Sequence, residues 1–155
     1  MPIPEFIVTL RRRIGHDLLW LPGVTAVVRH DDGRVLLTRR ADTGTWALPS
    51  GIPEPGEQPA SACAREVLEE TGVTVAVHRL LSVWSQPAIT YPNGDRCQFM
   101  DHVFDCRAVA GDAHPADDES LEVAWFHPSA LPDLPPEHRR LIAAAARSQM
   151  RTYFE

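Results

Sequence analysis

Apolar and polar positions alternate along the chain in patterns that switch between helical and extended periods. Near the start, apolar side chains recur at three- and four-residue intervals, which predicts an N-terminal helix within residues 1–19. These positions are Ile7, Leu10, Ile14 and Leu18. Two β-branched runs follow, GVTAVVRH and GRVLLTRR, and the Asp31-Asp32-Gly33 sequence between them is typical of a turn. The pair therefore predicts a β-hairpin.

The middle of the chain begins with a segment rich in proline and glycine, TWALPSGIPEPGE, which predicts a loop. A helix is expected over residues 59–71, because Pro59 suits a first helical position and Gly72 suits a helix stop. VTVAVHRLLSVWS then reads as a long strand. The turn sequence at residues 92–95 leads into a further strand.

The last third holds the short apolar run LEVAWF, which predicts a strand, and a closing helix within residues 136–150. Strands interleaved with two or three helices indicate a mixed α/β (α+β) domain in which helices cover a sheet. A chain of 155 residues is also the size of one domain, so we expect a single domain over residues 1–155.

Composition narrows the classes of function. The net charge of -6 argues against general affinity for nucleic acid or anionic membranes. All fifteen basic residues are arginine, which excludes a lysine nucleophile. Three cysteines without metal-ligand spacing indicate a reducing compartment, and no apolar stretch is long enough to span a bilayer. We therefore expect a cytoplasmic protein. The oligomeric state stays open, with a homodimer as one alternative that the N-terminal helix could serve.

Carboxylates are concentrated on the helix expected over residues 59–71. Glu66, Glu69 and Glu70 stand at i, i+3 and i+4 and so share one helix face, where like charges repel. The arrangement makes sense if a cation lies over that face. Oxygen ligands alone point to Mg²⁺ or Mn²⁺, which also bridge to substrate phosphates. An acidic solvated face is the alternative.

The spacing around these glutamates matches a known motif. From Gly51 the order is five residues, Glu57, seven residues, and then REVLEETGV at residues 65–73. This resembles the Nudix box, G-x5-E-x7-R-E-U-x-E-E-x-G-U with U aliphatic, and every fixed position is filled. The resemblance extends over about residues 20–135, through the WALP sequence before the box and the Trp125-Phe126 pair in the last strand.

Membership in the Nudix (MutT-like) family would imply a mixed sheet sandwiched between helices, with the box at residues 51–73 as loop, helix and loop. It would also imply Mg²⁺-dependent (or Mn²⁺-dependent) hydrolysis of a nucleoside diphosphate linked to another group. The metal ligands that the resemblance implies are Glu66, Glu69, Glu70 and the backbone carbonyl of Ser50, with Glu57 as a further contact. Arg65 would orient these carboxylates through bidentate hydrogen bonds.

The motif alone leaves two points open: the effect of the residue before the box, and the identity of the general base. The residue before the box is commonly glycine and is here Ser50, which would be strained if that position requires a positive φ. The general base is also variable in the family. Glu66 is one candidate, and the acidic run ADDESLE supplies the others, among which we favour Glu119 because it precedes the strand. The remaining candidates in this run are Asp117, Asp118 and Glu122.

The substrate is the least determined part of the analysis. Trp46, Trp84 and Tyr91 could stack on a base or ribose, although core packing is an equal explanation for the tryptophans. A substrate of the ADP-ribose or nucleotide-sugar type is the first expectation. Hydrolysis of modified (deoxy)nucleoside triphosphates is the alternative. A nucleotide-sensing module without catalysis is an alternative of another class, which retention of every box glutamate disfavours.

Overall fold

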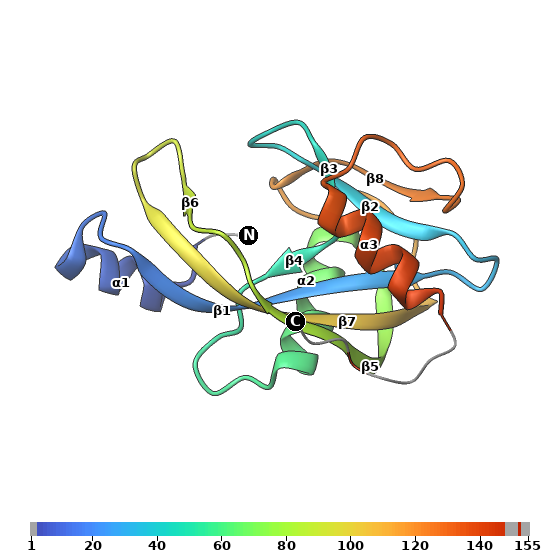
Figure 1. The fold of residues 1–155 in the computed structure, drawn as a ribbon, viewed down its shortest axis with the longest axis horizontal. Helices are drawn as coiled ribbons and strands as arrows, with labels where there is room; N and C mark the ends of the chain where they lie inside the picture. Colours follow the sequence, from blue (N-terminus) through green and yellow to red (C-terminus); the bar gives the residue numbers. More distant parts are fainter. Residues whose placement is uncertain (1–2, 148–151, 153–155) are drawn as a thin grey trace.

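The computed structural model describes residues 3–147 and residue 152 and contains three helices and a mixed sheet within that part of the chain (Figure 1). The helices are α1 (Glu5–Ile14), α2 (Pro59–Thr71) and α3 (Pro136–Ala145). The strands are β1 (Leu19–Arg29), β2 (Val35–Arg40), β3 (Trp46–Ala47), β4 (Ser50–Gly51), β5 (Thr74–Ser85), β6 (Ile89–Thr90), β7 (Arg96–Ala110) and β8 (Ser120–Phe126). None of the helices in this part is long and apolar enough to cross a membrane.

The sheet is mixed, as the sequence predicts. Its main strand order is β3-β2-β1-β7-β5, with β8 on β2, and β1 pairs with β7 in parallel while the other pairs are antiparallel. Alternate residues of β1 face opposite sides. Val24, Ala26 and Val28 pack with Val67 of α2, whereas Val27 packs with α3. Helices therefore cover both faces, which confirms the expected α+β sandwich.

The two halves of the sheet separate in the middle. The β1–β2 pairing is limited to Arg29 and Val35, beside the turn that was expected to close this hairpin. Further along, β4 pairs with β1 through Ser50 and Gly51, while β3 pairs with β2. The segment predicted as loop around residues 45–57 thus contains two short strands. That prediction was too simple, because β1 and β2 diverge and leave edges that passing backbone can pair with.

The helix bounds reflect local signals to different degrees. Helix α2 has the predicted bounds, with Pro59 in its first turn and Gly72 at φ 71° after its end. Helix α1 ends at Ile14, earlier than its apolar pattern suggests, because Gly15 at φ 60° follows and the chain then enters β1. Helix α3 ends at Ala145, and residues 148–150 of the predicted helix lie outside the described residues.

The N-terminal helix packs on a small apolar cluster at one end of the sheet, at the left in Figure 1. Ile7 of α1 meets Leu21 of β1 and Cys97 of β7 there, and all three side chains are buried. Cys63 lies instead in the core between α2 and the sheet, as expected, with its Sγ 3.9 Å from that of Cys106. The cysteines are free thiols and all three are buried.

A buried ion-pair network ties three strands together near α3. Asp105 on β7 is 3% exposed and accepts two hydrogen bonds of 2.9 Å from the Arg29 guanidinium on β1. The Nε of Arg79 on β5 donates a third, at 3.1 Å. Removing the central carboxylate would leave two partly buried cations facing each other.

We therefore expect Asp105→Asn to lower the free energy of unfolding by about 2 kcal/mol, since breaking a buried ion pair costs more than its formation gains. Urea unfolding measures the change. Asp31→Asn is the matched control, because Asp31 is an exposed partner of Arg107, and its loss should change stability by less than about 0.5 kcal/mol. Equal effects of the two substitutions would contradict a structural role for the network.

Candidate active site

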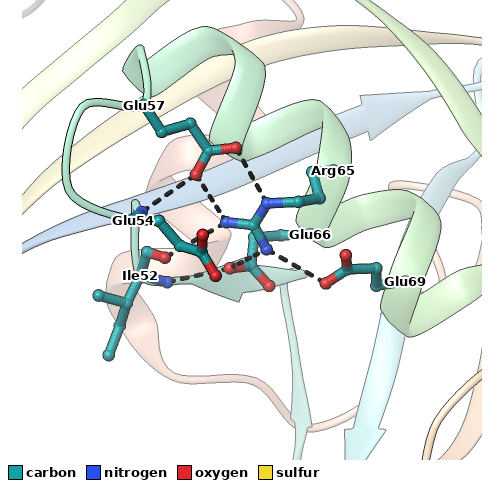
Figure 2. A network of polar contacts seen from close by, with 6 residues as sticks. All are labelled: Ile52, Glu54, Glu57, Arg65, Glu66 and Glu69. Atoms are coloured by element: carbon teal, nitrogen blue, oxygen red, sulfur yellow. Dashed lines mark hydrogen bonds and ion pairs between the residues drawn. The ribbon is translucent and has the colours of Figure 1, made fainter. Parts of the chain in front are cut away.

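Arg65 is the centre of a polar network that joins α2 to the loop before it (Figure 2). Its Nε and one terminal nitrogen donate to the two carboxylate oxygens of Glu57, at 2.9 and 2.8 Å. The other terminal nitrogen donates to Glu66 and Glu69, both at 3.1 Å. The planar guanidinium thus fixes three carboxylates at once, a geometry that a lysine ammonium does not reproduce.

Glu66 is the most buried of these carboxylates. Only 1% of its surface is exposed, and its Oε1 accepts hydrogen bonds from Arg65 and from the backbone N–H of Ile52. Its Oε2 is buried and has no hydrogen-bond partner. Burial raises the pKa of Glu66 to about 7, against the opposing effect of Arg65. A buried, half-satisfied carboxylate of this kind is suited to a cation.

Gly51 permits this burial. A Cβ at that position would overlap the carboxylate of Glu66, so only glycine lets the strand backbone pass against the acid group. The requirement is for space, and Gly51 does not need a positive φ. Among the described residues, positive φ occurs only at glycines, so Ser50 is not strained in that way. The substitution of serine for the common glycine therefore leaves an ordinary backbone at the carbonyl of interest.

Glu70 lies one helical turn further on and faces a cleft. Its pKa is raised to about 8, first by burial and then by the negative charges of Glu66, Asp117 and Glu119, while Arg40 opposes the shift. The acidic run after β7 lies close to Glu70, since Asp118 and Glu119 line the same cleft and the Ala116 N–H donates to the Glu70 carbonyl. Two carboxylates whose charged forms are both disfavoured again fit a cation better than a solvated face.

The segment that carries the acidic run is attached to the end of α2. The backbone N–H groups of His114 and Ala116 donate to the carbonyls of Thr71 and Glu70, at 3.0 and 3.2 Å. They satisfy carbonyls that a helix end leaves without partners. A Cβ at Gly72 would overlap the His114 ring, so this glycine allows both the helix stop and the docking. In the sequence, Gly72 indicated the end of the helix but not the contact with His114.

The cleft lies where the two halves of the sheet separate and has a volume of about 660 Å³. Four of the residues predicted for the site line it: Ser50, Glu70, Tyr91 and Glu119. Glu66, which was predicted with them, lies behind Gly51. Arg65, Glu57 and Glu69 form the network on the outer side of α2. Of the alternative acids, Asp118 lines the cleft, whereas Glu122 is exposed on β8 and pairs with Arg39 at 3.0 Å.

The two tryptophans proposed for substrate stacking are not among the residues that line the cleft. Trp46 packs edge-on against Phe126 at a ring-centroid distance of 4.8 Å, in the core beneath α3. Trp84 packs on the same core. Sequence reasoning also missed cleft residues that lie outside the motif, such as Arg40, whose guanidinium is held by Asp42 at 2.9 and 2.6 Å.

The donor set fits a divalent cation in its chemistry, although its side chains are not gathered as a closed cage. In residues 3–147 and 152, no three His, Cys, Asp or Glu side chains converge as metal ligands. Arg65 instead holds Glu66 and Glu69. The unpaired Oε2 of Glu66 and the raised pKa values of Glu66 and Glu70 are the observations that favour a cation here.

Comparison with known proteins gives one family. The family model for the NUDIX domain matches residues 19–145. A MutT-like protein of Streptomyces ambofaciens is 41% identical over 70% of this chain and 64% of its own length. An ADP-ribose pyrophosphatase of Methanocaldococcus jannaschii is 33% identical over 72% of this chain and 64% of that protein. A human 8-oxo-dGDP phosphatase is 34% identical over 96% of this chain and 44% of its length.

Comparison with solved structures gives the same family as the sequence relatives. The MutT protein from Methanosarcina mazei superposes with a TM-score of 0.69 and 26% identity, covering 83% of this chain and 94% of that one. The present chain spans less than two thirds of the length of each of the three sequence relatives named.

The raised pKa of Glu70 predicts how a neutral replacement changes stability. A carboxyl with a pKa of about 8 in the fold and an ordinary value of 4.5 gives stability that is fully present below 4.5 and lost as pH rises through 8. In EDTA, Glu70→Gln should therefore raise Tm by about 10 °C at pH 8. At pH 5, where little of this stability has been lost, the gain should be only about 2 °C. Thermal unfolding at both pH values measures this, and an equal gain at pH 5 would contradict the electrostatic cause.

Proposed function

Because the chain belongs to the Nudix family, we propose that it is a pyrophosphohydrolase that cleaves a nucleoside diphosphate linked to another group. The observation that carries the proposal is the pair of buried carboxylates beside the cleft. Glu66 retains a buried oxygen without a hydrogen bond, and burial and neighbouring carboxylates raise the pKa of Glu70 against the opposing effect of Arg40. Such a pair costs stability, which a binding function explains and solubility does not.

Glu66, Glu69, Glu70 and the backbone carbonyl of Ser50 would hold Mg²⁺ or Mn²⁺. When bound, the cation would neutralise the diphosphate charge and lower the pKa of a water molecule. Arg65 would then act as a positioning residue, since it contacts two of these carboxylates and anchors them to Glu57. Glu57 would contribute through this anchoring, or as a further contact to the cation.

The residues of the cleft would bind the substrate and move the proton. Glu119 is the proposed general base, because it lines the cleft close to Glu70 and can accept a proton from the attacking water. Glu66 is the alternative base. The Arg40 guanidinium lies on the β2 side of the same cleft and would attract a phosphate group. Tyr91, which also lines the cleft, would contact the nucleoside.

The substrate would be either a nucleotide with a diphosphate-linked sugar, such as ADP-ribose, or a modified (deoxy)nucleoside triphosphate. Relatives described as an ADP-ribose pyrophosphatase and as an 8-oxo-dGDP phosphatase support both classes. The alternative from another class is a module that binds nucleotide without turnover. The retained glutamates and the aligned Arg65 network support the enzyme over this alternative.

Turnover tests the proposal directly. With Mg²⁺ or Mn²⁺, we expect phosphate-containing products from at least one member of a panel of ADP-ribose, nucleotide sugars and canonical and oxidised (d)NTPs. EDTA should abolish the reaction. Glu70→Gln should lower kcat at least about 100-fold while the protein stays folded, because it removes a ligand of the cation. Nucleotide binding without any product from the whole panel would favour the sensing module instead.

The role of Arg65 can be separated from its charge. Arg65→Lys keeps the cation but cannot hold Glu57 bidentately while reaching Glu66 and Glu69. We expect the Mg²⁺ concentration for half-maximal activity to rise about tenfold. Arg39→Lys is the matched control, since Arg39 is an exposed strand arginine that pairs with Glu122. An unchanged Mg²⁺ dependence in Arg65→Lys would remove the positioning role.

A further inference from the structure

Helix α3 contacts the backbone that leads into the site, although none of the described residues that line the cleft belongs to this helix. The backbone N–H of Leu48 donates to Nδ1 of His138, in the first turn of α3, at 3.2 Å. The side chain of Leu48 is buried in the same core as Ile142 of α3, and it also lines the cleft. The helix therefore holds Leu48 through both its backbone and its side chain.

Leu48 belongs to the segment that crosses from one half of the sheet to the other. Before it, β3 pairs with β2, and after it, β4 pairs with β1. In the crossing itself, the carbonyl of Pro49 accepts a hydrogen bond of 2.9 Å from the N–H of Ala26. Proline has no N–H to donate, so the N–H of Leu48 is the donor that ties this crossing to α3 through His138.

The strand that follows is too short to fix its own carbonyl groups. β4 consists of Ser50 and Gly51, whereas strands usually extend over three residues or more. The direction of the Ser50 carbonyl, which would contact the cation in the proposed function, therefore depends on how residues 48 and 49 are held. A buried N–H without an acceptor is unfavourable, so loss of the acceptor on α3 would favour a rearranged crossing.

His138 can accept this hydrogen bond because its ring is neutral. A hydrogen bond accepted at Nδ1 leaves the ring proton on Nε2. Burial lowers the pKa of His138 below its ordinary value of 6.5, the negative charge of Glu137 opposes the shift, and the positive charge of Arg40 adds to it. The acceptor is therefore present at neutral pH.

We propose that His138 is a positioning residue of the cation site, which holds the N–H of Leu48 and thereby sets the direction of the Ser50 carbonyl. The proposal rests on the proposed function and adds to it a residue outside the Nudix box. His138 contacts neither the cation nor the substrate in this role. It acts through the backbone of the crossing segment.

Two substitutions separate the acceptor from the volume of the ring. His138→Asn shortens the side chain but keeps an acceptor oxygen in the place of Nδ1, whereas His138→Leu fills more of the space and removes the acceptor. If the ring served only to fill space, the smaller asparagine would be at least as damaging as leucine. A positioning role reverses this order.

Two measurements on the intact chain detect the effect. Without metal, the Leu48 amide should exchange its hydrogen at least about tenfold faster in His138→Leu than in the wild type, and within about threefold of it in His138→Asn. In titrations with Mn²⁺ followed by electron paramagnetic resonance, Kd should rise at least about tenfold in His138→Leu and stay within about threefold of the wild-type value in His138→Asn.

Ile142→Val is the matched control for a general loosening of α3. It trims the core under the helix without touching the N–H of Leu48, so it should lower Tm by about 3 °C and leave the Mn²⁺ affinity unchanged. A loss of Mn²⁺ affinity in Ile142→Val as large as that in His138→Leu would overturn the inference.

The inference would also be overturned by equal losses in His138→Asn and His138→Leu, by unchanged exchange of the Leu48 amide in His138→Leu, or by absence of Mn²⁺ binding to the wild type. Hydrolysis of a nucleotide together with unchanged Mn²⁺ affinity in His138→Leu would overturn it while sustaining the proposed function. Mn²⁺ affinity that depends on the acceptor, in a protein that hydrolyses no compound of the panel, would do the reverse.

Discussion

The close contact between the backbone of Gly51 and the carboxylate of Glu66 is the constraint on which the site depends. It pins a charged residue of α2 against β4, and β4 is itself paired with β1. The helix is thus fixed to the sheet by its acidic residues as well as by the apolar side chains of its other face. With Glu66 held in this way, helical periodicity turns Glu70 towards the cleft.

The cleft itself forms because β1 and β2 diverge. The contact between Gly51 and Glu66 then fixes α2 beside this cleft. Backbone groups freed by the separation are partly satisfied by β3 and β4, and the N–H of Ala26 donates to the carbonyl of Pro49 at 2.9 Å. The cleft therefore opens between two strands of one sheet. Glu70 of α2 lines one part of this cleft, and residues of β7 and α1 line another. In the proposed function the cation would lie on the α2 side and the nucleoside on the side of β7 and α1.

Features set by neighbours in sequence could be predicted, and those set by distant pairing could not. The bounds of α2 follow from Pro59 and Gly72, and the β1–β2 turn follows from Gly33 at φ 89°. The start of β1 at Leu19 depends on parallel pairing with Cys97, about half the chain away in sequence, for which the local pattern gives no signal. Motif and position predicted Ser50, Glu70, Tyr91 and Glu119 for the site, and all four line the cleft. Asp101, a buried residue that also lines the cleft, was not predicted, because an isolated aspartate in a strand shows its burial and its neighbours only in the fold.

Helix α1 forms part of the cleft wall from outside residues 19–145, the part that matches the family model. Ile7 and Arg11 reach the cleft from this helix, and Arg11 is tied to β7 through the carbonyl of Arg96. The acidic helix and one wall of the cleft thus lie on different segments of the polypeptide. Substitutions in α1 can change the shape of the cleft without altering the contacts of Glu66 and Arg65 on α2. In the proposed hydrolase, sequence change confined to α1 would alter which compounds fit while the residues that would hold the cation stay in place.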